Sequence, residues 1–284
     1  MLIIIAGIFW GVMGVFVRML TEYGFTSIQI TVIRFSIGIF CLAIYMLIYD
    51  KSLFKISLKG LLLCVAIGVF SCFLMSTLYF VSIEETSLSV AAILLYTAPV
   101  WVVLASVLLY GEKFTAKICI ALILAFLGCV FVSGFSAGKV SVLGVVSGIV
   151  AGFAYALYSI LGKPALKLCS PYTMTFYSFS VGAICALAIC NIVEFGNIIS
   201  TNFDFVLILK MLGTGLITMF VPFLSYTIGL TKLPAGKASI MATVEPMMAT
   251  VSGMIFFGEI PSLLGFLGIA LIFTAVILLN LKED

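Results

Sequence analysis

Glu245 is the residue whose position most strongly suggests chemistry. It is a carboxylate inside a long apolar stretch, and the nearest charges along the chain are Lys237 before it and Glu259 after it. A bare carboxylate within a bilayer is costly, so such a residue is paired, protonated or turned towards water. Pro246 follows it and leaves the carbonyl of Ala242 without its helical donor. A freed carbonyl beside a carboxylate can hold a proton, a cation or a substrate amine.

Two other readings of the buried charges stay open. Glu245 can instead be a structural carboxylate that caps a broken helix or ties two helices together. Arg34 is a second charge within an apolar stretch, and we name it as a candidate coupling or ion-pair partner of Glu245. Its long stem can alternatively carry the guanidinium to the outer surface near Glu22. Lys163, next to Pro164, is expected at the inner surface.

Aromatic residues recur inside the same apolar stretches. They are Trp10, Tyr79, Tyr96, Trp101, Tyr155, Tyr158 and Tyr226. Tyrosine and tryptophan commonly gather at membrane interfaces, which is the competing explanation for about half of a set like this one. Trp10 and Tyr155 fall in the middle of their stretches, where that explanation weakens. Aromatic walls suit flat or cationic solutes through stacking and cation–π contacts.

Hydroxyl groups complete the predicted binding site. Ser239 and Thr243 are four residues apart, so they share one face of a helix and can offer hydroxyls to a ligand. The predicted substrate-binding residues are Trp10, Tyr79, Tyr96, Tyr155, Tyr226, Ser239, Thr243 and Glu245. The chain has no histidine, which removes histidine-based catalysis and histidine metal sites. We therefore expect no catalytic residue, no metal and no cofactor, and any proton coupling has to use a carboxylate.

The elements that must position these residues are apolar helices. The chain is 64% hydrophobic and only 9% charged, against roughly 25% charged residues in a soluble domain. About 20 apolar residues cross a bilayer as a helix. The sequence predicts ten such spans, at 2–20, 28–48, 60–81, 88–109, 115–133, 141–161, 173–193, 206–229, 236–257 and 263–281. The loops left over are too short for an ATP-binding module, and we expect the first span to be retained rather than cleaved as a signal peptide.

Charge between the spans predicts their orientation. With the N-terminus in the cytoplasm, ten lysines fall inside and three cations, including Arg18, fall outside. The inner set is Lys51, Lys55, Lys59, Lys113, Lys117, Lys163, Lys167, Lys232, Lys237 and Lys282, and the outer set is Arg18, Lys139 and Lys210. This bias follows the positive-inside rule, so we expect both termini in the cytoplasm and the protein in the cytoplasmic membrane.

The sequence repeats itself. A shift of 147 residues superposes Tyr79 on Tyr226, Ala91 on Ala238, Pro99 on Pro246 and Gly111-Glu112 on Gly258-Glu259. Near the N-terminus a shift of 145 residues aligns Gly7 with Gly152 and Trp10 with Tyr155. Matched apolar residues are common in such a composition, whereas paired proline and Gly-Glu matches are not.

The repeat predicts two five-helix units, residues 1–138 and 139–284. Because five is odd, the two units enter the membrane from opposite sides, which makes an inverted repeat. That architecture is common in secondary transporters, whose binding sites lie near the midplane between the halves. Pro99 and Pro246 are the predicted helix breaks, but Ala98-Pro99 lacks the carboxylate of its mate. A function that depends on this charge is therefore asymmetric.

The second half carries a series of motifs: Leu233 to Ser239, Glu245-Pro246, Gly258-Glu259 and the run from Gly265 to Leu279. Together they resemble the motifs of the EamA-type branch of the drug/metabolite transporter superfamily. The first half carries a less complete version, and its Gly7-Ile8-Phe9-Trp10-Gly11 resembles the family's first-helix motif. The resemblance implies an all-α membrane protein of ten helices, with inside termini and alternating access. It also implies a cavity lined by helices one, three, four, six, eight and nine.

We expect a secondary active transporter of a small organic metabolite, such as an amino acid or an amine, with export favoured and protons as the candidate coupling ion. An uncoupled facilitator or channel and a multidrug exporter are the alternatives, and the family leaves substrate and direction open. A membrane enzyme or a purely structural membrane protein fits less well. Expected partners are the small-molecule substrate and the lipid bilayer, with no nucleic acid, in a monomer or homodimer.

Overall fold

The computed structural model describes residues 1–134 and 141–281, and within them ten helical segments are long and apolar enough to cross a membrane. Their bounds lie close to the predicted ones, which confirms the all-helical fold class. The segments are Leu2–Thr21, Ser27–Tyr49, Leu58–Glu85, Leu88–Tyr110, Ala116–Ser133, Val142–Ala165, Pro171–Ile189, Phe205–Lys232, Ala235–Phe257 and Leu263–Asn280. Lys139, Lys282 and the predicted boundary between residues 138 and 139 lie outside the described residues.

Several segments are built from more than one helix. The first comprises α1 (Leu2–Gly11) and α2 (Met13–Thr21), the fourth α6 (Leu88–Leu95) and α7 (Ala98–Tyr110), and the ninth α14 (Ala235–Ala242) and α15 (Val244–Phe257). The third joins α4 (Leu58–Ala66) to α5 (Met75–Glu85) through a π-helical stretch, Ile67–Leu74. The eighth joins α12 (Phe205–Gly215) to α13 (Val221–Lys232) through a second one, Leu216–Phe220. Such wide turns recur at functional sites.

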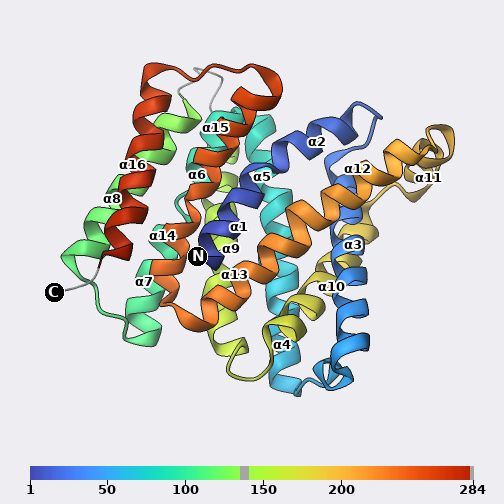
Figure 1. The fold of residues 1–284 in the computed structure, drawn as a ribbon, viewed down its shortest axis with the longest axis horizontal. Helices are drawn as coiled ribbons and strands as arrows, with labels where there is room; N and C mark the ends of the chain where they lie inside the picture. Colours follow the sequence, from blue (N-terminus) through green and yellow to red (C-terminus); the bar gives the residue numbers. More distant parts are fainter. Residues whose placement is uncertain (135–140, 282–284) are drawn as a thin grey trace.

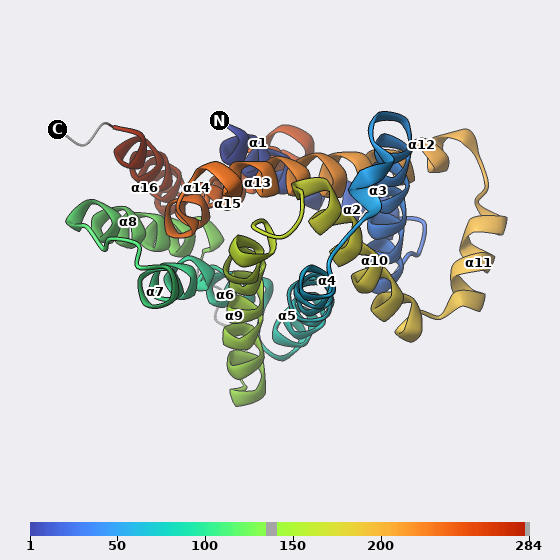
Figure 2. The same ribbon diagram turned by 90° about the horizontal axis from the view of Figure 1, so that it is seen from below.

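The remaining long helices are continuous. They are α3 (Ser27–Tyr49), α8 (Ala116–Ser133), α9 (Val142–Ala165), α10 (Pro171–Ile189) and α16 (Leu263–Asn280). A short 3-10 turn, Lys51–Phe54, follows α3. The sequence analysis did not predict α11 (Ile192–Thr201), which lies in the connection between the seventh and eighth segments. Both views place α11 at the edge of the molecule opposite α8 and α16 (Figures 1 and 2).

Several elements of the two halves match. Shifted by 147 residues, the bounds of α6 become those of α14 and the bounds of α8 become those of α16. Gly111 and Gly258 end α7 and α15 in the left-handed conformation, with φ of 65° and 67°, which glycine adopts without strain. The connection after α7 lies at the bottom of Figure 1 and the connection after α15 at the top. We call these two ends of the molecule the Gly111 end and the Gly258 end.

The halves are also joined directly, through α8 and α16. A β-carbon on Gly128 of α8 would lie 2.8 Å from the carbonyl oxygen of Gly268 on α16. A β-carbon on Gly268 would lie 2.7 Å from the carbonyl oxygen of Gly128 in return. Small residues let the two backbones approach this closely, as is usual between helices in membranes. The α8–α16 pair lies at one edge of the bundle (Figure 2).

Candidate substrate site

Two glycines of the first segment position Glu245. A β-carbon on Gly11 would lie 2.4 Å from Cβ of Met248 and 2.7 Å from the carbonyl oxygen of Glu245. One on Gly7 would lie 3.2 Å from the carbonyl oxygen of Ala242. The predicted packing of the Gly7-xxx-Gly11 pair is therefore a contact between α1 and the broken ninth segment, at the turn that carries Glu245.

The ninth segment breaks at Thr243, between α14 and α15. Glu245 and Pro246 lie in the first turn of α15, where the missing N–H of proline costs no intrahelical bond. The hydroxyl of Thr243 donates to the carbonyl of Ile240 at 2.6 Å, which supports the break. Pro99 occupies the matching position at the start of α7. Both predicted helix-break prolines thus lie just after an interruption of their segments.

Glu245 receives a hydrogen bond across the centre of the molecule. The phenolic hydroxyl of Tyr155, on α9, donates to Oε2 of Glu245 at 3.1 Å. α9 belongs to the second half and continues past Tyr155 with Tyr158 and Ser159, one turn further on. A charge-assisted bond of this kind orients the carboxylate and leaves Oε1 for another partner.

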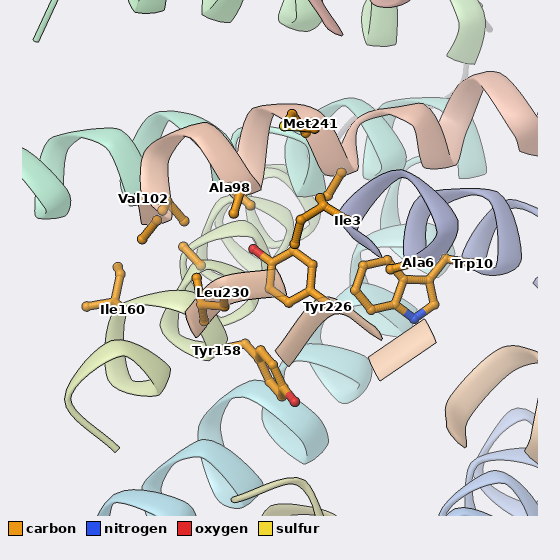
Figure 3. Close-up of a cluster of buried hydrophobic side chains, with 14 of the residues drawn as sticks. Ile3, Ala6, Trp10, Ala98, Val102, Tyr158, Ile160, Tyr226, Leu230 and Met241 are labelled. Carbon is orange, nitrogen blue, oxygen red and sulfur yellow. The ribbon is translucent and has the colours of Figure 1, made fainter. Parts of the chain in front are cut away.

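Aromatic rings surround the same place. The ring centroid of Trp10 lies 4.9 Å from that of Phe223 and 5.4 Å from that of Tyr226. Tyr158 approaches Phe223 edge-on at 5.3 Å. Figure 3 shows Trp10, Tyr158 and Tyr226 converging from three different segments. The hydroxyl of Tyr226 is 2.6 Å from that of Ser159, and the hydroxyl of Tyr158 is 2.8 Å from that of Thr227, so the polar tips are held by hydrogen bonds.

These residues line a cavity, and the empty space among them, counted together with the part open to solvent, is ≈ 450 Å³. Among the residues that line it are seven of the eight predicted for substrate binding: Trp10, Tyr96, Tyr155, Tyr226, Ser239, Thr243 and Glu245. Pro99 also lines it. Glu245 is the acidic residue in this lining, and the other side chains offer rings, hydroxyls and small apolar groups.

The two remaining predicted residues lie elsewhere. Tyr79, on α5, is not part of the cavity lining. Arg34, on α3, donates from Nε to Oγ1 of Thr218 at 2.9 Å and from a terminal nitrogen to the Thr218 carbonyl at 3.1 Å. Its charge acts on Glu245 from a distance, and the ion pair found in the described part of the chain is a different one, Arg18 with Glu259. A direct Arg34–Glu245 pair stays a prediction.

The sequence analysis left Phe223, Tyr158 and Ser159 out of the site. Tyr158 and Ser159 are three and four residues after Tyr155, so helical spacing alone places them on the same face of α9. Phe223 has no comparable signal, because its repeat mate is Ser76. Its contribution depends on how α13 packs against α1, which the sequence does not reveal.

A bundle of apolar helices in two matched halves, with a polar and aromatic cavity between them, is the architecture of a multi-pass membrane transporter. The chain belongs to the EamA-like transporter family, which it matches over residues 1–134 and 142–281. The resemblance described above is thereby confirmed. Transport, rather than catalysis, is the activity that this family and its relatives indicate.

Three comparisons show how far the likeness extends. An uncharacterized transporter of Archaeoglobus fulgidus is 30% identical over 276 residues, which cover 97% of this chain and 94% of that protein. Threonine/homoserine exporter RhtA of Salmonella typhimurium is 28% identical over 187 residues, 65% of this chain and 60% of the exporter. A crystal structure with 16% sequence identity superposes with a TM-score of 0.80 over 98% of this chain and 95% of that one, a likeness of fold alone.

Proposed function

We propose that this chain is a secondary active transporter that exports a small metabolite with an amino group, such as an amino acid, by alternating access. We place it in the cytoplasmic membrane with both termini in the cytoplasm. The observation that carries this proposal is the carboxylate of Glu245, held by Tyr155 in an aromatic cavity where the two halves meet. Export is supported by the relative RhtA, which is named as a threonine/homoserine exporter.

The chemistry of the cavity favours a cationic group on the substrate. Ring faces attract cations, and the rings of Trp10, Tyr155 and Tyr226 line the space that Glu245 also lines. A substrate ammonium can therefore bind the free oxygen of Glu245 while its carbon atoms lie against the rings. Ser239 and Thr243 line the same cavity and supply hydroxyls for the rest of a polar solute.

The same carboxylate supports coupling to protons. Glu245 can hold a substrate ammonium or a proton, but one carboxylate in a confined cavity does not hold both. Because the substrate and the proton compete for Glu245, their two binding equilibria are linked. A proton gradient can therefore drive the solute in the direction opposite to the flow of protons. An uncoupled facilitator would bind the same solute but only equilibrate it, and a multidrug exporter would accept solutes that share little beyond apolar bulk.

A thermal-shift screen tests the binding step. L-threonine, L-homoserine, simple amines, nucleosides and vitamins would be added to purified protein, since a ligand that binds the folded state raises the melting temperature. We expect the hits to carry an amino group. Glu245→Gln should lose the shift while expressing near normal levels, and Glu194→Gln, which changes an exposed acid on α11, should keep it. Hits without any basic group, or a full shift in Glu245→Gln, would refute the proposed recognition.

A further inference from the structure

The repeat mates α6 and α14 are covered to very different extents. All eight residues of α14 except Lys237 are buried. Of the eight residues of α6, only Ala91 and Leu95 are buried. Two elements with the same place in their repeats would be covered equally in a symmetric molecule. The structure is therefore closed over α14 at the Gly111 end and open around α6 at the Gly258 end.

A carboxylate holds the closed end together. Oε1 of Glu112 accepts a hydrogen bond from the N–H of Ala235 at 2.8 Å, and Oε2 accepts one from the N–H of Gly236 at 3.3 Å. These are the first two N–H groups of α14, whose N-cap residue Pro234 provides no side-chain cap. The N-terminus of a helix is partially positive, so it favours a carboxylate there.

A lysine acts at the same junction. Lys163, near the end of α9, donates from Nζ to the carbonyl of Leu233. Leu233 lies two residues before the start of α14. Glu112 lies near enough for its charge to act on that of Lys163. The closed end thus uses one acid and one base, each docked on backbone groups at the start of the ninth segment.

The repeat mates of this acid and base bind each other at the open end. The 147-residue shift carries Glu112 to Glu259, and the 145-residue shift carries Arg18 to Lys163. A terminal nitrogen of Arg18 is 2.6 Å from Oε1 of Glu259. Both side chains are about half exposed, at 52% and 54%. The same two groups that dock on α14 at the closed end are here paired with one another.

The backbone groups that would receive them at the Gly258 end are present. The mates of the Ala235 and Gly236 N–H groups are those of Leu88 and Ser89, the first two of α6. The side-chain hydroxyl of the N-cap residue Ser87 accepts a hydrogen bond from the N–H of Val90, at 3.2 Å, so this cap does not compete for them. The mate of the Leu233 carbonyl is that of Thr86.

Glu112 and Lys163, docked at the start of α14, lock the Gly111 end in the closed conformation. We propose that Glu259 and Arg18 form the equivalent lock of the Gly258 end, an inference that rests on the alternating access proposed above. When the Gly258 end closes, Glu259 leaves Arg18 and binds the N–H groups of Leu88 and Ser89, while Arg18 turns to the carbonyl of Thr86. When the Gly111 end opens, Glu112 and Lys163 leave α14 and bind each other. In each state one acid and base bind the start of a helix, and the other acid and base bind each other. The two states therefore stay close in free energy, and a ligand can shift their populations.

Amide hydrogen exchange of the intact protein tests this lock. Glu112→Gln removes the docked carboxylate at the closed end and so favours the opposite state. Exchange should rise about fivefold at Ala235 and Gly236, as expected for one capping interaction, and it should fall at Leu88 and Ser89. The double variant Glu112→Gln/Glu259→Gln should lose that new protection of α6. Glu22→Gln, which changes an exposed acid at the Gly258 end, should alter neither helix.

Two results would overturn the lock. One is a rise of exchange in α14 with no fall in α6, which a merely local role of Glu112 would produce. The other is protection of α6 that persists in the double variant. If Glu112→Gln does not purify, Lys163→Gln removes the other half of the same lock and takes its place. Counterflow of L-threonine or another screening hit by the wild type tests the proposed function separately, because transport without the reciprocal shift contradicts the lock alone.

Discussion

Glu245 receives a hydrogen bond from Tyr155 on α9, and this contact makes the site testable at the scale of a residue. Tyr155→Phe keeps the ring in the cavity lining and removes only the hydroxyl that donates to Oε2 at 3.1 Å. Because hydrogen bonds to charged groups contribute about 1.5–3 kcal/mol, we expect the apparent KM for the solute to rise about tenfold or more.

Tyr177→Phe is the matched control for that variant. The hydroxyl of Tyr177 also donates a hydrogen bond, at 2.8 Å, but to the carbonyl of Phe54 at the end of the 3-10 turn. Its KM should stay at the wild-type value. An equal rise of KM in both variants would assign the effect to general loss of packing and not to Glu245.

At this scale the sequence predicted most residues of the site but not the hydrogen bonds that the buried charges make. Glu245 stood out because a charge interrupts an apolar run, and Trp10 because it falls mid-span. The contact of Arg34 with Thr218 was not predictable, since it depends on a π-helical stretch that shifts the register of the eighth segment. The partner of Glu112 was equally hidden, because a backbone N–H leaves no signature in a sequence.

At the scale of elements, the contact between α1 and α15 is the one that holds Glu245 in place. Gly11→Ala would place a methyl group 2.4 Å from Cβ of Met248, so one of the two helices has to move. Overpacking of this kind costs about 1–3 kcal/mol. We expect a lower melting temperature and weaker ligand-induced stabilisation, measured by thermal unfolding in detergent.

Gly14→Ala is the comparison for that variant, because Gly14 follows on α2 with open space where its β-carbon would be. Alanine forms helices better than glycine, so this change should be neutral or slightly stabilising. A similar fall of the melting temperature in both variants would show that the loss does not come from the close contact between α1 and α15.

The repeat explains why so many element bounds were predictable. A proline and a turn glycine recur at one shift, and they mark the same interruption and the same helix end in both halves. The break of the first segment after Gly11 has no such marker, because α9 runs unbroken through the equivalent place. α11 escaped prediction because its apolar residues form one face of a short helix and not a run long enough to span.

At the scale of the whole molecule, the inverted repeat makes a prediction about sides. The connections after α7 and after α15 lie at opposite ends of the bundle (Figure 1). A protease site inserted next to Lys113 should therefore be cut only from the cytoplasm, and one inserted next to Ile260 only from outside. Cleavage of both from the same side of sealed vesicles would contradict the topology.

The difference between an open and a closed end is a property of the whole molecule that no sequence pattern predicted. The two halves carry the same motifs at Gly111-Glu112 and Gly258-Glu259, and these motifs do not distinguish an open end from a closed one. The difference in cover between α6 and α14 comes from the conformation that the molecule adopts, which a repeat leaves undetermined. That asymmetry is also the main structural support for alternating access.

Transport against a gradient tests the central claim most directly. Wild-type protein and Glu245→Gln would be reconstituted in liposomes with an imposed pH difference, and uptake of the strongest amine-bearing hit from the thermal screen would be followed. The account predicts that the wild type accumulates the solute above the outside concentration and that Glu245→Gln does not. Wild-type uptake that stops at equal concentrations, or accumulation that survives in Glu245→Gln with the same dependence on the pH difference, would contradict it.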